Sequence, residues 1–250
     1  MKNSLLLLVI AATSIFITNI VHANNNFDLF IEGCHLDDPI PIPSDWNAIY
    51  TTKNKNNKSS KLLKADLLLS KKFANVDDFY DFCVKIKPNN AEKTYTTPIV
   101  LIKGSELKAG IINSASMSSN SFKEHQNRTF TGGEKIPETD ESIKIKLGES
   151  EYILRQNTKL DDYATGNNHI LTLYHSDVSQ LIFNKRGNYE GETGFYIIWA
   201  GDIDNDNKLD LILNLPEHYA SPYDLRLFLS SYASKGQLVK QVVERGFSSP

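Results

Sequence analysis

The chain has 250 residues, 40% of them hydrophobic, and a formal net charge of −3 at pH 7. This length is enough for one large domain or two small ones. The mild negative charge argues against a nucleic-acid partner, because binding to a phosphate backbone normally requires a basic face.

The first 23 residues have the pattern of an export signal. Lys2 supplies the positive start, residues 5–17 form an apolar run, and Ala23 is a small residue at the expected cleavage point before Asn24. The apolar run is shorter than the roughly 20 residues that a membrane span requires. We therefore predict a signal peptide over residues 1–23 and a periplasmic or secreted protein without a membrane span after cleavage.

The two cysteines, Cys34 and Cys83, both follow the expected cleavage point. An even pair of cysteines in an oxidising compartment favours one disulfide bond. Closing a loop of this size is worth roughly 4 kcal/mol in the chain-entropy model. The alternative is a pair of buried free thiols.

The part of the chain before residue 143 is expected to be β-rich with little helix. Strand patterns occur at 67–69, 79–86 and 99–103 within an N-terminal region that we assign to residues 24–112. Residues 113–142 are poor in large apolar side chains and rich in Ser, Asn, Thr and Gly. This composition is typical of a long loop or linker and makes 113–142 the predicted domain boundary.

Strand patterns follow one another closely from residue 143 to the end of the chain. Several strands at short spacing, with few helical periodicities, indicate a mainly β fold whose C-terminal domain, 143–250, is an antiparallel sheet or barrel-like. The segment 237–244 fits a helix about as well as a strand. The patterns themselves occur at 143–147, 152–155, 169–175, 178–183, 195–200, 209–215 and 225–229.

The strongest chemical pattern is a group of four aspartates between two apolar strand-like runs. A twelve-residue calcium loop uses oxygen ligands from positions 1, 3, 5, 7 and 9, with position 7 contributing its backbone carbonyl. Without a counter-ion these acids would repel one another, and the alternative is an ordinary solvated hairpin loop. The spacing predicts Ca²⁺ ligands at Asp202, Asp204, Asp206, Lys208 and Asp210.

Two positions of this loop depart from the EF-hand pattern. Position 6 usually holds glycine in a left-handed conformation, and Asn207 stands there as one of the residues that tolerate this conformation best. Position 12 holds Leu213 in place of a bidentate glutamate. We therefore predict a weak structural site, with a dissociation constant on the order of 10⁻⁴–10⁻³ M.

The loop sequence GDIDNDNKLDLIL resembles the calcium loop of FG-GAP/VCBS-type repeats. Their consensus, G-D-x-[DN]-x-D-G-x-x-D-L, is matched except at Asn207. The resemblance covers residues 201–213 well and residues 195–231 loosely, and it implies a β context and a Ca²⁺ ligand set without implying integrin-like function. Because the loop occurs once, a multi-blade propeller is not expected.

Catalytic motifs of the helical zinc-protease, nucleophile-elbow and P-loop kinds do not occur in the chain. His169 and His175 lie six residues apart, on one face of a predicted strand, where structural hydrogen bonding is favoured over zinc ligation. Glu217 and His218 follow the calcium hairpin and, with Asp224 and Arg226, could line a polar cleft, although an ordinary polar loop is the favoured interpretation.

The sequence therefore predicts an exported calcium-binding β protein that is a binding or structural module without catalytic activity. Its partner would be an exported protein or a glycan. One alternative is an exported hydrolase with structural calcium, which the segment around Glu217 and His218 motivates. Another alternative is an adhesion or inhibitor module that acts on another exported protein.

Overall fold

The computed structural model describes residues 27–31, 33–35, 45–51, 60–70, 82–88, 100–118, 134–135, 142–160, 167–187, 195–216 and 223–247. All regular structure within these ranges is β, and every strand pairing is antiparallel. The mainly β prediction is thus confirmed. The predicted cleavage site between Ala23 and Asn24 lies outside the described residues, as do Glu217 and His218.

The strands in chain order are β1 (Phe27–Phe30), β2 (Gly33–His35), β3 (Asn47–Thr51), β4 (Ser60–Ser70), β5 (Phe82–Pro88), β6 (Val100–Gly104), β7 (Gly110–Ser114), β8 (Ser116–Ser118), β9 (Glu134–Lys135), β10 (Ser142–Leu147), β11 (Ser150–Leu160), β12 (Asn167–His175), β13 (Val178–Gly187), β14 (Tyr196–Asp202), β15 (Asp210–Asn214), β16 (Tyr223–Leu229) and β17 (Lys240–Phe247). The ambiguous segment 237–244 is thus a strand from residue 240 onward, and its residues 237–239 precede that strand. Across the described ranges, no helix has the length and apolar character needed to cross a membrane.

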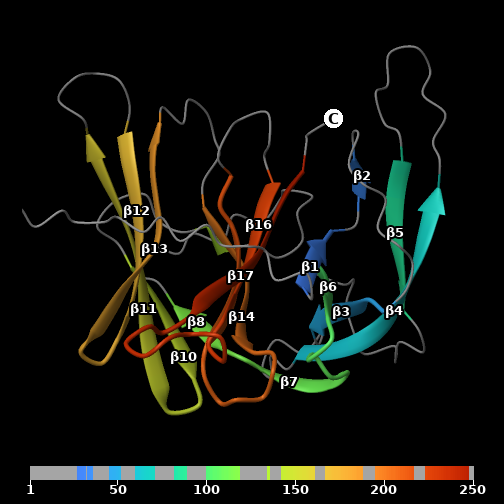
Figure 1. Ribbon diagram of the computed structural model, residues 1–250, viewed down its shortest axis with the longest axis horizontal. Helices are drawn as coiled ribbons and strands as arrows, with labels where there is room; N and C mark the ends of the chain where they lie inside the picture. Colours follow the sequence, from blue (N-terminus) through green and yellow to red (C-terminus); the bar gives the residue numbers. More distant parts are fainter. Residues whose placement is uncertain are drawn as a thin grey trace, which may run out of the picture.

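The larger sheet curves until its last strand lies beside its first (Figure 1). Its main path runs β1-β6-β3-β4-β7-β14-β15-β16-β17, with β2, β5 and β9 paired onto it from the side. The guanidinium of Arg245 on β17 lies 6.0 Å from the ring centre of Phe30 on β1. The ring of Phe27 meets Tyr232 edge-on, with centroids 5.5 Å apart. These contacts close the curved sheet around one hydrophobic core.

A second sheet, in the order β13-β12-β11-β10-β8, packs over the outer face of β14, β15 and β16 (Figure 1). Strand β10 shows the strict alternation that this packing requires, because Ile143, Ile145 and Leu147 are buried while Lys144 and Lys146 are exposed. One face of the second sheet is thus apolar and the other faces solvent.

Strands β14 to β16 are buried on both faces, which explains their nearly continuous apolar sequences. On β15, Ile212 packs into the core of the curved sheet, whereas Leu211 and Leu213 pack into the core between the two sheets. On β16, Leu227 packs into the core of the curved sheet, and Phe228 packs into the core between the two sheets. The hairpin of β14 and β15, which carries the acidic loop, therefore lies between the two hydrophobic cores.

The strands on the two sides of the predicted linker, 113–142, share one sheet. Strand β7 pairs with β4 on one side and with β14 on the other. The predicted linker range itself includes β8 and β9. The division into 24–112 and 143–250 remains a prediction, although strands from both regions build the same hydrophobic core in the described residues.

The backbone places Cys34 directly opposite Cys83 in the pairing of β2 with β5. Directly opposed residues of antiparallel strands have Cα atoms about 4.5–5.5 Å apart, which lies inside the range of about 4.4–6.8 Å that disulfides use. The described part of the chain does not include these two side chains, so the disulfide stays a prediction that the register accommodates.

Gln180 of β13 joins the second sheet to the segment that enters β17. Its amide nitrogen donates to the carbonyl of Val239 at 2.7 Å, and its amide oxygen accepts from the backbone nitrogens of Leu238 and Val239 at 2.6 and 3.0 Å. Because Val239 is fully buried, Gln180→Ala should leave these backbone groups without partners and destabilise the protein by about 2 kcal/mol in urea unfolding. The exposed Asn184→Ala on the same strand is the control, and equal stability of the two variants would refute the role of Gln180.

Candidate metal centre

The acidic loop connects two neighbouring strands, with Asp202 at the end of β14 and Asp210 at the start of β15. Within the loop, Asn205 and Asn207 adopt left-handed backbone conformations with φ of 64° and 63°. This confirms the expectation that Asn207 replaces the usual glycine at position 6, because asparagine is one of the few residues that tolerate this region.

The carboxylate of Asp202 organises the loop that follows it. One oxygen accepts from the backbone nitrogen of Asp206 at 2.9 Å, and the other accepts from that of Asn207 at 3.0 Å. Asp202 is almost completely buried, with 1% of its surface exposed. Burial raises the pKa of this carboxyl, and the two N–H donors oppose that rise only in part.

The carboxylate of Asp210 fastens the loop to a segment that is distant in sequence. It accepts from the backbone nitrogens of Ile203 and Ser230, each at 2.8 Å. Burial, followed by repulsion from the carboxylate of Asp204, raises the pKa of Asp210 from 3.8 to about 8. Without an ion, the loop therefore disfavours the ionised form of Asp210.

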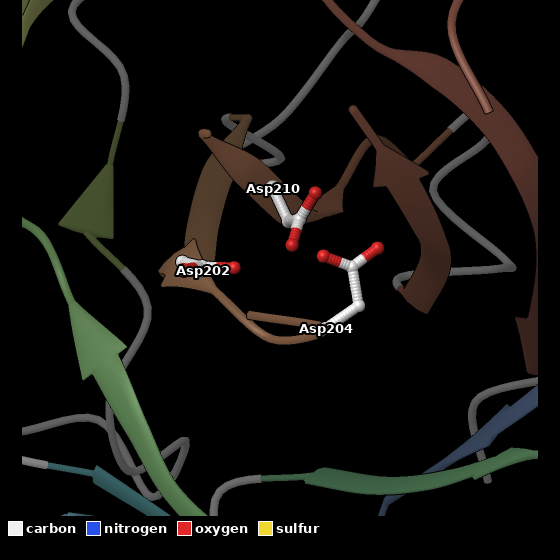
Figure 2. Close-up of side chains that lie close together, drawn as sticks. All are labelled: Asp202, Asp204 and Asp210. Carbon is white, nitrogen blue, oxygen red and sulfur yellow. The ribbon is translucent and has the colours of Figure 1, made fainter. Parts of the chain in front are cut away.

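The carboxylate of Asp204 completes a group of three that turn toward one another (Figure 2). Its Oδ2 accepts from the hydroxyl of Ser231, whereas its Oδ1 is shielded from solvent and has no hydrogen-bond partner. Ligand oxygens of Asp202, Asp204 and Asp210 all lie within 4.8 Å of one another. Two oxygens bound to one Ca²⁺ can be at most about 5 Å apart, so these three carboxylates can share an ion.

Of the other two predicted ligands, Asp206 is not part of this group of carboxylates, and Lys208 was predicted to contribute its backbone carbonyl, which stays a prediction. The carboxylate oxygens of Asp206 lie 3.0 and 2.9 Å from the hydroxyl of Ser230, and one of them accepts from the backbone nitrogen of Lys208 at 2.8 Å. The ammonium of Lys208 is exposed and lies 4.0 Å from Asp206. Sequence reasoning missed Ser230 because it lies 20 residues beyond Asp210, outside any loop motif.

Gly201 precedes the first aspartate because β7 passes very close to it. A Cβ atom added at Gly201 would lie 2.2 Å from the carbonyl oxygen of Asn113 and 2.6 Å from the ring of Trp199. Gly201→Ala should therefore destabilise the protein by about 2 kcal/mol in urea unfolding. The control is Asn113→Ala, which keeps the obstructing carbonyl, and a Gly201→Ala protein as stable as this control would contradict the close approach.

Two side chains of the second sheet lie near the loop. The hydroxyl of Tyr152 bonds to the backbone of Leu209, and burial raises the pKa of this phenol. Its ring stacks on that of His175 at a centroid distance of 4.2 Å, and His175 Nδ1 lies 2.9 Å from the carbonyl oxygen of Glu151. The loop is therefore packed against both sheets, and His175 has the structural role that was predicted.

The buried His169 lies at the other end of the same strand. Its ring meets Phe195 edge-on at 5.8 Å, and its Nδ1 lies 3.5 Å from the amide nitrogen of Gln156. Within the described residues, neither His169 nor His175 belongs to a group of side chains that could hold a metal. The structural interpretation of both histidines is thus consistent with their surroundings.

Asp224 and Arg226, two of the four residues considered for a polar cleft, form a buried ion pair. The guanidinium of Arg226 donates to Asp224 at 2.7 Å and to Glu244 at 3.3 Å, and it lies 4.9 Å from the ring centre of Phe183. Asp224 and Arg226 are 5% and 7% exposed. These contacts bind β16 to β17 and to the second sheet.

No protein-family model, curated protein or solved structure matches this chain. The resemblance to FG-GAP/VCBS-type calcium loops therefore rests on residues 201–213 alone and remains a prediction.

Proposed function

We propose that this protein is an exported calcium-binding β protein in which Ca²⁺, held by Asp202, Asp204 and Asp210, braces the loop between β14 and β15. The observation that carries the proposal is the convergence of three carboxylates, one of which, Asp204, has an Oδ1 that is shielded from solvent and has no hydrogen-bond partner. A buried carboxylate oxygen without a partner is costly, and a bound cation would remove that cost.

The donor set favours calcium over softer metals. All three converging side chains are carboxylates, with no histidine or cysteine among them. Hard oxygen ligands suit Ca²⁺ and Mg²⁺, whereas zinc and copper prefer sites with nitrogen or sulfur. A loop shaped by its own backbone also suits Ca²⁺, because Mg²⁺ demands a nearly ideal octahedron.

The proposed role of the ion is structural. Two of the three converging aspartates, Asp202 and Asp210, also accept hydrogen bonds from backbone N–H groups, which belong to Ile203, Asp206, Asn207 and Ser230. A bound cation would compensate the negative charge of these carboxylates, so they could stay ionised while they accept the backbone hydrogen bonds. We therefore propose a binding or structural module, whose partner is another exported protein or a glycan.

Calorimetric titration and thermal unfolding of the mature chain test the proposal. Ca²⁺ should bind with a dissociation constant on the order of 10⁻⁴–10⁻³ M. Excess calcium at one hundred times that constant should stabilise the protein by about 2.7 kcal/mol. Asp204→Ala should lose both responses, whereas Asp177→Ala, an exposed acid in the turn between β12 and β13, should keep them. A parent protein that takes up no calcium, or an Asp204→Ala protein that responds like the parent, would refute the site.

Export and the disulfide between Cys34 and Cys83 belong to the same proposal and have a separate test. Protein recovered from the exported fraction of its own cells should begin at Asn24. When the protein is treated with an alkylating agent, its intact mass should rise by the mass of two alkyl groups only if a reductant has been added first. An N-terminus at Met1, or alkylation of both thiols without reductant, would contradict export or the disulfide respectively.

A further inference from the structure

The hydroxyl of Ser230 occupies a place that an ordinary hydrogen bond does not explain. It lies 3.0 and 2.9 Å from the two carboxylate oxygens of Asp206 and 3.1 Å from Oδ1 of Asp210. A serine hydroxyl has one proton to donate, which can be shared between the two oxygens of Asp206 or directed at Asp210 but cannot serve both carboxylates. The remaining contact brings two oxygens together inside a nearly closed site, since Ser230 is 4% exposed.

Contacts of this length are the normal spacing of oxygens around one cation. Metal–oxygen distances of about 2.3–2.6 Å place neighbouring ligands of a calcium shell about 3 Å apart. Serine and threonine hydroxyls act as ligands of hard cations in other sites, such as that of Mg²⁺ in phosphate-binding loops. The hydroxyl oxygen of Ser230 and the Oδ1 of Asp210, 3.1 Å apart, therefore have the composition and the spacing of two neighbouring ligands of one ion.

The backbone of Ser230 is held in position before any ion arrives. Its nitrogen donates to Asp210 at 2.8 Å, and its carbonyl accepts from the backbone nitrogen of Ala233 at 3.0 Å, inside the turn that follows β16. A hydroxyl on a fixed backbone loses little conformational entropy when it becomes a ligand. Ser230 is thus preorganised beside the three converging carboxylates.

The neighbouring Ser231 positions one of those carboxylates. Its hydroxyl donates to Oδ2 of Asp204, and the other oxygen of Asp204 is the shielded atom without a partner. A hydrogen bond to one oxygen of a ligating carboxylate orients the other oxygen toward the metal, and losing such a bond commonly costs about tenfold in affinity.

We propose that Ser230 supplies its hydroxyl oxygen as a ligand to Ca²⁺ and that Ser231 is a positioning residue for Asp204. This inference rests on the proposed function, because it assigns two further residues to the same ion. The ion then links the loop between β14 and β15 to the turn between β16 and β17. At the far end of that turn, Leu238 and Val239 bond to Gln180 of the second sheet. The ion and Gln180 together therefore connect three segments that are distant in sequence.

Calcium titration calorimetry of the full mature chain tests this ligand set with four variants. Ser230→Ala and Ser231→Ala should each weaken binding about tenfold, whereas Ser234→Ala, an exposed serine of the same turn, should bind like the parent. Ser230→Cys keeps nearly the same volume but replaces the hard oxygen with soft sulfur, so it should bind calcium as weakly as Ser230→Ala. Unfolding of each variant in chelator verifies that it folds.

The possible results separate the two proposals. If Ser230 only donates a hydrogen bond to the calcium-free loop, its removal would free carboxylate oxygens, and Ser230→Ala and Ser230→Cys would bind calcium as tightly as Ser234→Ala or more tightly. That result would overturn the present inference while the carboxylate site stands. A parent chain that binds no calcium would overturn the site itself and this inference with it.

Discussion

Asp210→Ala is expected to destabilise the calcium-free protein by about 3 kcal/mol, because it leaves two buried backbone N–H groups without an acceptor. These groups belong to Ile203 and Ser230, which each donate to the Asp210 carboxylate at 2.8 Å. Asp210 is fully buried, so water cannot replace the lost acceptor. Urea unfolding in the presence of chelator measures the change.

Asp204→Ala is the matched comparison, and its effect should differ in sign between conditions. Repulsion from Asp204 contributes to the raised pKa of Asp210. Asp204 also accepts no backbone N–H in the described residues. Removal of the Asp204 carboxylate should therefore leave the calcium-free protein equally stable or more stable. In calcium the same variant should fall below the parent, because it cannot bind the ion. If both variants lose the same stability in chelator, the separate roles of Asp204 and Asp210 are wrong.

The stability of the calcium-free protein is expected to fall as the pH rises from 3.8 to about 8. These limits are the pKa of Asp210 in the unfolded chain and its raised value in the folded protein. Over this window the native carboxyl keeps its proton while the unfolded chain has released it. The native state therefore binds more protons, and the free energy of unfolding decreases by up to about 1.4 kcal/mol per pH unit. The raised pKa of Asp202 acts in the same direction.

Bound calcium should remove this dependence, because the ion keeps both carboxylates charged in the native state. Calcium affinity should accordingly increase with pH across the same window, as fewer protons are displaced on binding. Melting temperatures measured at several pH values, in chelator and in excess calcium, test both statements. Asp210→Asn cannot titrate and should flatten the chelator curve. A parent curve that rises with pH in chelator would contradict the burial of the charged loop.

The local parts of the site could be predicted because they depend on short spacings. Alternating aspartates between apolar runs indicated a strand–loop–strand unit, and β14 and β15 lie where those runs occur. Asn207 was expected to be left-handed because a loop of this form requires it at position 6, and it has a φ of 63°. Each inference used residues that are close in the chain, where sterics and strand periodicity act directly.

The exceptions come from residues that arrive from elsewhere in the fold. Asp206, a predicted ligand, is outside the group of three carboxylates, and its own carboxylate contacts the hydroxyl of Ser230, which lies 24 residues later. Asp224 and Arg226, considered for a polar cleft, form a pair that is buried because the second sheet covers that face of β16. The periodicity of a strand sequence does not predict which other sheet will pack against that strand.

The sequence by itself determined that this chain is built of strands, that one turn carries four acids between two apolar runs, and that this turn needs asparagine in a left-handed position. Only the tertiary structure decided that β7 connects the early and late strands into one sheet, that Ser230 and Ser231 meet the acids, and that Gln180 ties the two sheets together. The physical reason is that strand periodicity and turn sterics act over a few residues, whereas the order of strands and the burial of polar groups depend on which distant segments bury apolar surface together.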